Sequence, residues 1–88
     1  MTCPYFAAFV FSPADLVTGP LFGFTTPRAL GKAVVRNRIR RRVREAVRLE
    51  RHAFGTNWMI VFNPRRSCLE ASFEDIRREV ARVASRCK

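Results

Sequence analysis

Apolar residues gather in three short runs, separated by polar and turn-forming stretches, along this 88-residue chain. The first run, Tyr5–Phe11, is rich in aromatic and apolar residues and predicts a strand. Ser12–Pro20 holds two prolines and a glycine and predicts a loop, and Leu21–Thr26 predicts a second strand, stopped by Pro27. The third run, Asn57–Asn63, is continuously apolar, which is typical of a strand that is buried on both faces or central in its sheet.

Two other stretches repeat apolar residues at the spacing of a helix. The first extends from near Lys32 to near His52, and Gly55 is a plausible end signal. The second, Phe73–Cys87, follows Ser72, which forms a capping-box-like start with Asp75. Each stretch therefore predicts a helix that packs one face on a core. The two apolar stripes are Val35, Ile39, Val43, Ala46 and Val47, and Phe73, Ile76, Val80, Val83, Ala84 and Cys87.

The predicted order is strand, strand, helix, strand, helix. This order favours a small α+β fold, a two-layer sandwich with two helices over one sheet. A chain of 88 residues is long enough for one domain with a modest core, so we assign residues 1–88 to a single domain.

The first strand offers two apolar faces to this sandwich. With a side-chain period of two, Phe6, Ala8 and Val10 share one face, and we expect the helices to pack there. The opposite face is then open, and it carries Tyr5, Ala7, Phe9 and Phe11.

The outer surface of the first helix is crowded with positive charge. Nine of the twenty residues from 32 to 51 are Lys or Arg, and eight of these nine are Arg. An ordinary solvated face usually mixes the two signs of charge, and the planar guanidinium group suits phosphate oxygens. We therefore predict a polyanion-binding helix. Only Arg42 falls within the apolar arc, where we expect its stem to be buried and its charged head to reach water. The outward residues are Asn37, Arg41, Arg44, Arg48 and Arg51, bordered by Arg36, Arg38 and Arg40.

The charge of the whole chain agrees with that prediction. The net charge is +10 and the isoelectric point is near 11.4, which indicates nucleic acid or an anionic surface as the partner. The closing helix is predicted to have a more balanced surface, because Glu74 and Glu79 accompany its arginines.

No catalytic or metal-binding pattern is found in the sequence. Its single histidine, His52, is interpreted as a surface or capping residue, and Cys68, with no histidine nearby, as an inert thiol. The three cysteines are widely spaced without a C-x-x-C motif, which fits neither a disulfide framework nor a zinc site and is typical of a reducing cytosol. The longest apolar run, Tyr5–Phe11, is far shorter than the roughly 20 residues of a membrane span.

The segment GKAVVRNRIRRRVREA resembles the protein subunit of bacterial ribonuclease P. Arg36-Asn37-Arg38 matches the family's most specific motif, and Gly31-Lys32-Ala33-Val34 matches its lead. Agreement extends upstream through Phe22-Gly23-Phe24 and downstream through the spacing to the third strand and the closing helix, over most of residues 5–86. The family usually begins with a basic N-terminal segment and helix that forms one wall of a cleft, whereas this chain begins at about the first long strand. We therefore expect an exposed apolar sheet surface and a tendency to aggregate.

The resemblance implies an RNA-centred enzyme. In that family the RNA subunit, with bound magnesium, removes the 5′ leader of precursor tRNA, and the protein is a non-catalytic subunit. The implied protein is cytoplasmic, makes no membrane contact and binds no cofactor alone. One protein is expected to pair with one catalytic RNA and to hold the leader of the precursor tRNA. The implied fold is that of ribonuclease P protein (ribosomal S5 domain 2-like), with a left-handed crossover between parallel strands.

Two sets of site residues follow. The resemblance implies RNA contacts by the motif residues Arg36, Asn37, Arg38, Arg40, Arg41 and Arg44, and the positive charge on and just before the helix adds Arg28, Lys32 and Arg48 to this set. The resemblance also implies that Phe9 lines the leader cleft on the sheet, and the strand period places Tyr5 and Phe11 on the same face.

Three other functions were weighed. A ribosomal or other structural RNA-binding protein would share the composition, and the motif in its context favours ribonuclease P over it. A DNA-binding regulator is disfavoured because the basic helix has neither a heptad zipper nor a helix-turn-helix partner. Membrane-surface binding is disfavoured because the stripe of the helix contains only Val, Ile and Ala, and the core needs that stripe.

Overall fold

The predicted order of elements is confirmed in the computed structural model, which describes residues 1–12 and 19–88. Most of the predicted loop Ser12–Pro20 lies outside the described residues. The strands are β1 (Phe6–Phe11), β2 (Leu21–Phe24) and β3 (Met59–Pro64), and the helices are α1 (Ala33–Glu50) and α2 (Phe73–Ser85). Short 3-10 turns lie at Arg28–Leu30, Arg51–Ala53 and Arg66–Leu69.

The elements differ from the predicted ones only near their ends. β2 stops at Phe24, yet the Thr25 N–H still donates to the Phe62 carbonyl at 3.0 Å, so the pairing continues past the strand. α1 stops at Glu50 because the chain tightens there into the turn Arg51–Ala53, as helix ends often do.

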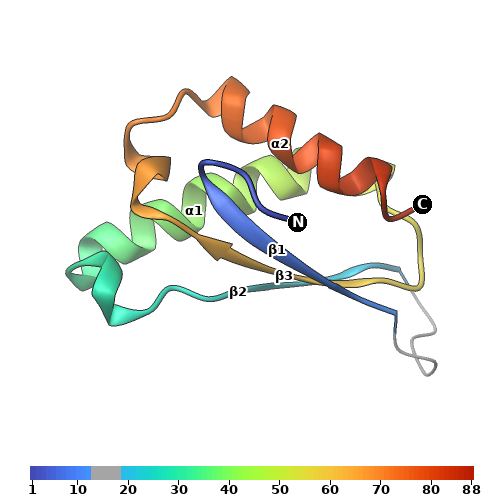
Figure 1. Ribbon diagram of the computed structural model, residues 1–88, viewed down its shortest axis with the longest axis horizontal. Helices are drawn as coiled ribbons and strands as arrows, with labels where there is room; N and C mark the ends of the chain where they lie inside the picture. Colours follow the sequence, from blue (N-terminus) through green and yellow to red (C-terminus); the bar gives the residue numbers. More distant parts are fainter. Residues whose placement is uncertain (13–18) are drawn as a thin grey trace.

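β3 occupies the centre of the sheet, whose strand order is β1-β3-β2. β1 runs antiparallel to β3 and β2 runs parallel to it, so α1 is the crossover between two parallel neighbours. The continuous apolar character of β3 is explained by this central position. Both helices lie on the same side of the sheet (Figure 1).

The core lies between the sheet and the two helices. The side predicted to face the helices is confirmed for Phe6 and Ala8, which are both buried. Val10 differs: it is 36% exposed and borders an open groove with Trp58 and Arg86, near the C-terminal end of α2. The other residues of the buried core cluster are Ile39, Val43, Ala46, Val47, Phe54, Ile60, Phe62, Cys68, Ile76, Val80, Val83, Ala84 and Cys87.

The two helix signals predicted from the sequence have different outcomes. The Ser72 hydroxyl accepts a hydrogen bond from the Asp75 N–H at 3.1 Å, so the predicted cap of α2 is confirmed. Gly55 does not end α1 directly. A Cβ at this position would lie 2.6 Å from the carbonyl carbon of Lys88, so glycine is required where the C-terminus packs closely.

Candidate nucleic-acid interface

The outward side chains of α1 form a continuous basic surface. Asn37, Arg38, Arg41, Arg44 and Arg48 are all exposed. Two shallow hollows connect the first four, since Asn37 and Arg41 line both, Arg44 borders one and Arg38 borders the other, and a third hollow joins Arg44 to Arg48. Five of the residues predicted to contact RNA thus stand on one surface, as the helical spacing indicated.

Three arginines of α1 are only half-exposed and are partly engaged within the protein. Arg40 donates from Nη2 to the Thr26 hydroxyl at 3.0 Å, and this bond links α1 to the chain just before it. The Nε atoms of Arg36, Arg40 and Arg42 are buried and have no hydrogen-bond partner within the described residues. Arg36 and Arg40 therefore offer RNA less of their guanidinium groups than the outward arginines do.

Arg42 makes a contact that the sequence did not predict. Its Nε is buried, and Nη2 donates to the Ala71 carbonyl at 2.5 Å. Ala71 lies just before α2, so this arginine joins the two helices. The bond could not be read from the helical spacing, since the carbonyl that Arg42 contacts is 29 positions away in the sequence.

Most of the positive charge on α1 is uncompensated. In the described part of the chain, Arg48 is the only arginine of α1 with an ion-pair partner, and this partner is Glu45. That pairing lowers the pKa of the Glu45 carboxyl and raises the pKa of Arg48, mainly through their hydrogen bonds. The other acid of α1, Glu50, accepts from Arg77 of α2. The surface therefore attracts a polyanion.

The N-terminal end of α1 adds to this positive charge. Lys32 occupies the N-cap position without a side-chain cap bond, and the first turn contains no acid. Lys32 and Arg28 are both exposed, so two more predicted residues flank the positive end of the helix dipole. The backbone N–H groups there suit a phosphate.

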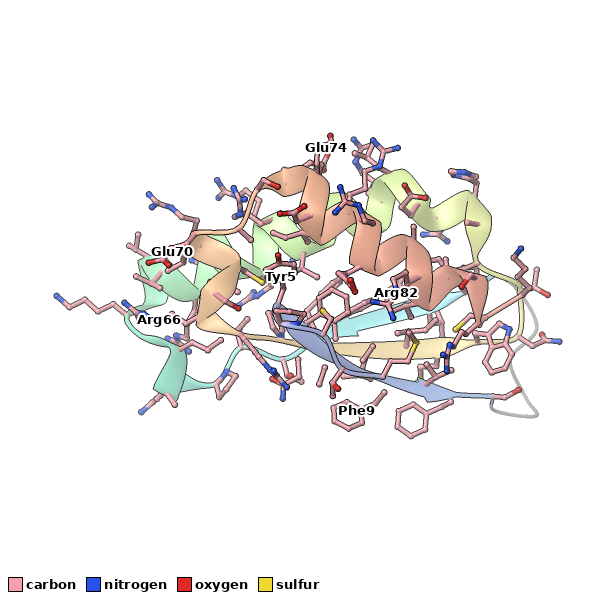
Figure 2. All side chains as sticks on the ribbon, turned by 45° about the horizontal axis from the view of Figure 1, so that its top comes forward. Tyr5, Phe9, Arg66, Glu70, Glu74 and Arg82 are labelled. Carbon is pink, nitrogen blue, oxygen red and sulfur yellow. The ribbon has the colours of Figure 1, made fainter. Side chains whose placement is uncertain are left out.

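The opposite face of the sheet presents apolar side chains to solvent. Phe9 is 52% exposed, Phe11 49% and Leu21 50%. Phe9 points away from the helices (Figure 2), which confirms that it lies outside the core and on the open face. Exposed apolar surface of this kind marks an interaction site or a risk of aggregation.

Tyr5 does not belong to this open face. It precedes β1, is half-buried and packs against the core, on the helix side of the sheet (Figure 2). Its carbonyl accepts from the Arg65 N–H at 2.8 Å and from the Cys68 thiol at 3.1 Å. The expectation that Tyr5 shares a face with Phe9 was wrong, because strand alternation begins only at Phe6.

The described residues offer little chemistry of their own. Residues 1–12 and 19–88 contain no group of three or more His, Cys, Asp or Glu side chains that could hold a metal ion. Burial raises the pKa of the Cys68 thiol to about 11, so this cysteine is inert, as interpreted from the sequence. Neither described helix is long and apolar enough to cross a membrane.

The family model for ribonuclease P matches residues 4–88, nearly the whole chain. The chain belongs to the ribonuclease P protein family.

Curated relatives agree with this membership, and a solved structure agrees with the fold. The ribonuclease P protein component of Roseiflexus sp. (strain RS-1) is 49% identical over 65 residues, which cover 73% of this chain and 53% of that protein. The component from Symbiobacterium thermophilum is 44% identical over 64 residues, covering 73% and 56%. The chain therefore spans about half the length of these relatives. The ribonuclease P protein of Thermotoga maritima, at 24% identity, superimposes with a TM-score of 0.84 over 100% of this chain and 82% of that one, which confirms the α+β fold.

Proposed function

We propose that this chain is the protein subunit of a ribonuclease P that removes the 5′ leader of precursor tRNA in the cytoplasm. The observation that carries the proposal is the exposed and largely unpaired arginine surface of α1, which displays Arg36-Asn37-Arg38 in a member of this family. Phosphate contacts by such a surface supply affinity that depends strongly on salt.

The two predicted binding surfaces have a useful arrangement. The basic surface belongs to the helix layer, whereas Phe9 lies on the open face of the sheet, and Phe11, two residues further along β1, lies on the same face. A catalytic RNA on α1 therefore leaves the aromatic face free for unpaired leader bases. Base–aromatic stacking contributes about 1–3 kcal/mol per base, enough to distinguish precursor from mature tRNA.

The chemistry of cleavage is assigned to the RNA subunit and its magnesium. In this proposal the protein contributes binding and positioning. Arg38, Arg41 and Arg44 hold phosphates of the RNA subunit in this scheme, and one protein serves one RNA.

Reconstitution with the catalytic RNA of the same organism tests the proposal. The protein alone should not cleave precursor tRNA. Added to the RNA, it should lower the magnesium required and should tighten binding of precursor tRNA more than binding of mature tRNA. RNase activity of the RNA-free protein that is abolished by one side-chain substitution would contradict this assignment. RNA binding without any effect on leader removal would favour a structural RNA-binding protein instead.

Phe9→Ala tests the leader surface. This variant should fold, because Phe9 is half-exposed, and it should bind precursor tRNA about five- to a hundredfold more weakly with little change for mature tRNA. Val34→Ala, which truncates an exposed apolar side chain on α1, is the matched control and should preserve the ratio of the two affinities. Equal weakening of both tRNAs by Phe9→Ala would show that the leader lies elsewhere.

A further inference from the structure

A second aromatic surface lies between β2 and α1, separate from the open face of the sheet. Phe22 and Phe24 of β2 form one side of a groove of about 200 Å³, and Val47 of α1 is buried beside them. The rim on the helix side consists of Arg44, Arg48 and Arg51. The predicted site residues include two of these arginines, Arg44 and Arg48, but neither phenylalanine, because the sequence indicates Phe22 and Phe24 only as part of a strand that resembles the family.

The two rings are held in place from behind. Phe22 meets Phe54 edge-to-face, with ring centroids 4.9 Å apart, and Phe24 stacks on Phe62 with centroids 5.7 Å apart. Phe54 and Phe62 are buried, whereas Phe22 and Phe24 are half-buried. The core thus orients the two rings while part of each remains accessible, so little side-chain entropy is lost when a ligand stacks on them.

The backbone at the groove supplies polar groups. The N–H groups of Leu21 and Thr25 donate to β3, at the carbonyls of Trp58 and Phe62. Because alternate residues of an edge strand direct their N–H and C=O groups to opposite sides, those of Phe22 and Phe24 point away from the sheet. Unpaired backbone groups therefore lie along the edge of β2 that borders the groove.

The rim gives the groove a positive charge. The Arg51 guanidinium carbon lies 5.9 Å from the centre of the Phe22 ring, and Arg44 is exposed with no ion pair to any described residue. Glu45 neutralises only Arg48. Flat rings that adjoin guanidinium groups match a nucleotide, whose base stacks and whose phosphate is anionic.

We propose that this β2–α1 groove binds one unpaired nucleotide of the RNA that lies on α1. The base packs against Phe22 and Phe24, and the phosphate lies between Arg44 and Arg51. A purely helical RNA leaves the groove empty, because its bases are stacked on one another. The inference rests on the proposed RNA binding by α1 but not on leader cleavage.

Short RNA probes test the groove directly with the full chain. A single-stranded pentanucleotide with one 4-thiouridine should crosslink on irradiation to the segment that contains Phe22 and Phe24. The same strand with 2-aminopurine should lose fluorescence on binding, and the matching duplex should not. Crosslinks confined to other parts of the protein would overturn the proposal.

Two substitutions separate stacking from charge. Phe22→Leu should weaken pentanucleotide binding about fivefold or more with an unchanged salt slope, because stacking releases no counterions. Arg51→Gln should reduce the slope of log K against log salt by about 0.7, as expected for one phosphate contact with a single strand. The matched controls are Phe73→Leu, a half-buried phenylalanine at the start of α2, and Arg78→Gln, an exposed arginine of α2, and both should bind like the unaltered protein.

If Phe22→Leu fails to fold, Phe22→Tyr and the crosslink decide instead. Phe22→Tyr retains the ring and should keep the affinity, and a crosslink of the unaltered protein to β2 needs no variant. Unchanged affinity for the pentanucleotide in a folded Phe22→Leu protein would refute nucleotide binding in the groove. Normal pentanucleotide binding with no stimulation of leader removal would contradict the proposed function and leave the groove standing.

Discussion

The two helices pack on the same core but present very different surfaces. α1 carries seven arginines and two glutamates, and one of these arginines is ion-paired with another described residue. α2 carries three arginines and three acids, and all three arginines are paired. The partners are Glu50 for Arg77, Asp75 for Arg78 and Glu79 for Arg82. Local charge balance, rather than the presence of arginine, therefore distinguishes the surface that we propose binds RNA from the surface of α2.

The starts of the two helices show the same contrast. α2 begins with a capping serine and two acids in its first turn, which stabilise a helix by themselves. α1 begins with Lys32, no cap bond and no acid. The N-terminal end of α1 therefore lacks internal stabilisation, and we expect an anionic partner to bind there.

The largest difference between the two helices is expected in the salt dependence of RNA binding. The triple variant Arg41→Ala, Arg44→Ala, Arg48→Ala should flatten the slope of log K against log salt for the catalytic RNA by roughly two units, at about 0.7–0.9 per phosphate contact. Because Arg48 is already paired with Glu45, we expect less than three full contacts to be lost. Binding titrations at several salt concentrations measure the slope.

The control for this triple variant lies on the other helix. Arg77→Ala, Arg78→Ala, Arg82→Ala, which replaces the three arginines of α2, removes the same formal charge and should change the slope by less than one unit. Circular dichroism should show that both variants keep their helices. Equal changes in the slope of log K against log salt for the two variants would show that the helices do not differ in RNA binding.

The core that the helices share should respond to alkaline pH through Cys68. Burial raises the pKa of this thiol from 9.0 to about 11, so the folded chain retains the proton over a range in which the unfolded chain loses it. The resulting stability is complete below about pH 9 and is lost as the pH rises towards 11, by roughly 3 kcal/mol. Urea unfolding of the unaltered protein and of Cys68→Ala should show the difference between them shrinking over this range. A constant difference would contradict the shift.

Arginines within α1 should themselves divide into two kinds. Arg42→Ala should lower the free energy of unfolding by about 1–2 kcal/mol, because it removes a charged hydrogen bond to the Ala71 carbonyl. Arg38→Ala, which removes an exposed side chain, should change stability by less than about 0.5 kcal/mol but should weaken RNA binding. Thermal and urea denaturation measure both variants. Similar stability losses would show that Arg42 is a surface residue like Arg38.

The smallest effect concerns the helix starts. Ser72→Ala should cost about 1 kcal/mol, since it leaves the Asp75 N–H without its side-chain partner. Lys32→Ala should cost little in the free protein because Lys32 makes no cap bond, and its effect should appear in RNA affinity. A loss of stability as large as that of Ser72→Ala would show that Lys32 contributes to the helix start in another way.

Local periodicity determined much of this protein from sequence alone. The period of the apolar residues gave the order of elements and the buried stripes, because burial of one face requires it. The density of arginine on α1 and its Arg36-Asn37-Arg38 motif indicated both a polyanion partner and the family. These features depend on neighbours within a few positions, so no tertiary contact was needed to predict them.

Contacts between distant residues decided the rest. Arg42 is an internal tether because Ala71 comes to lie beside it, and Tyr5 joins the core because the chain bends before β1. The groove with Phe22 on one side and Arg51 on the other exists only once β2 has packed beside α1. The type of a side chain determines which ligands it can bind. Only the packing of elements that are far apart in the sequence determines which side chains remain free to bind a ligand.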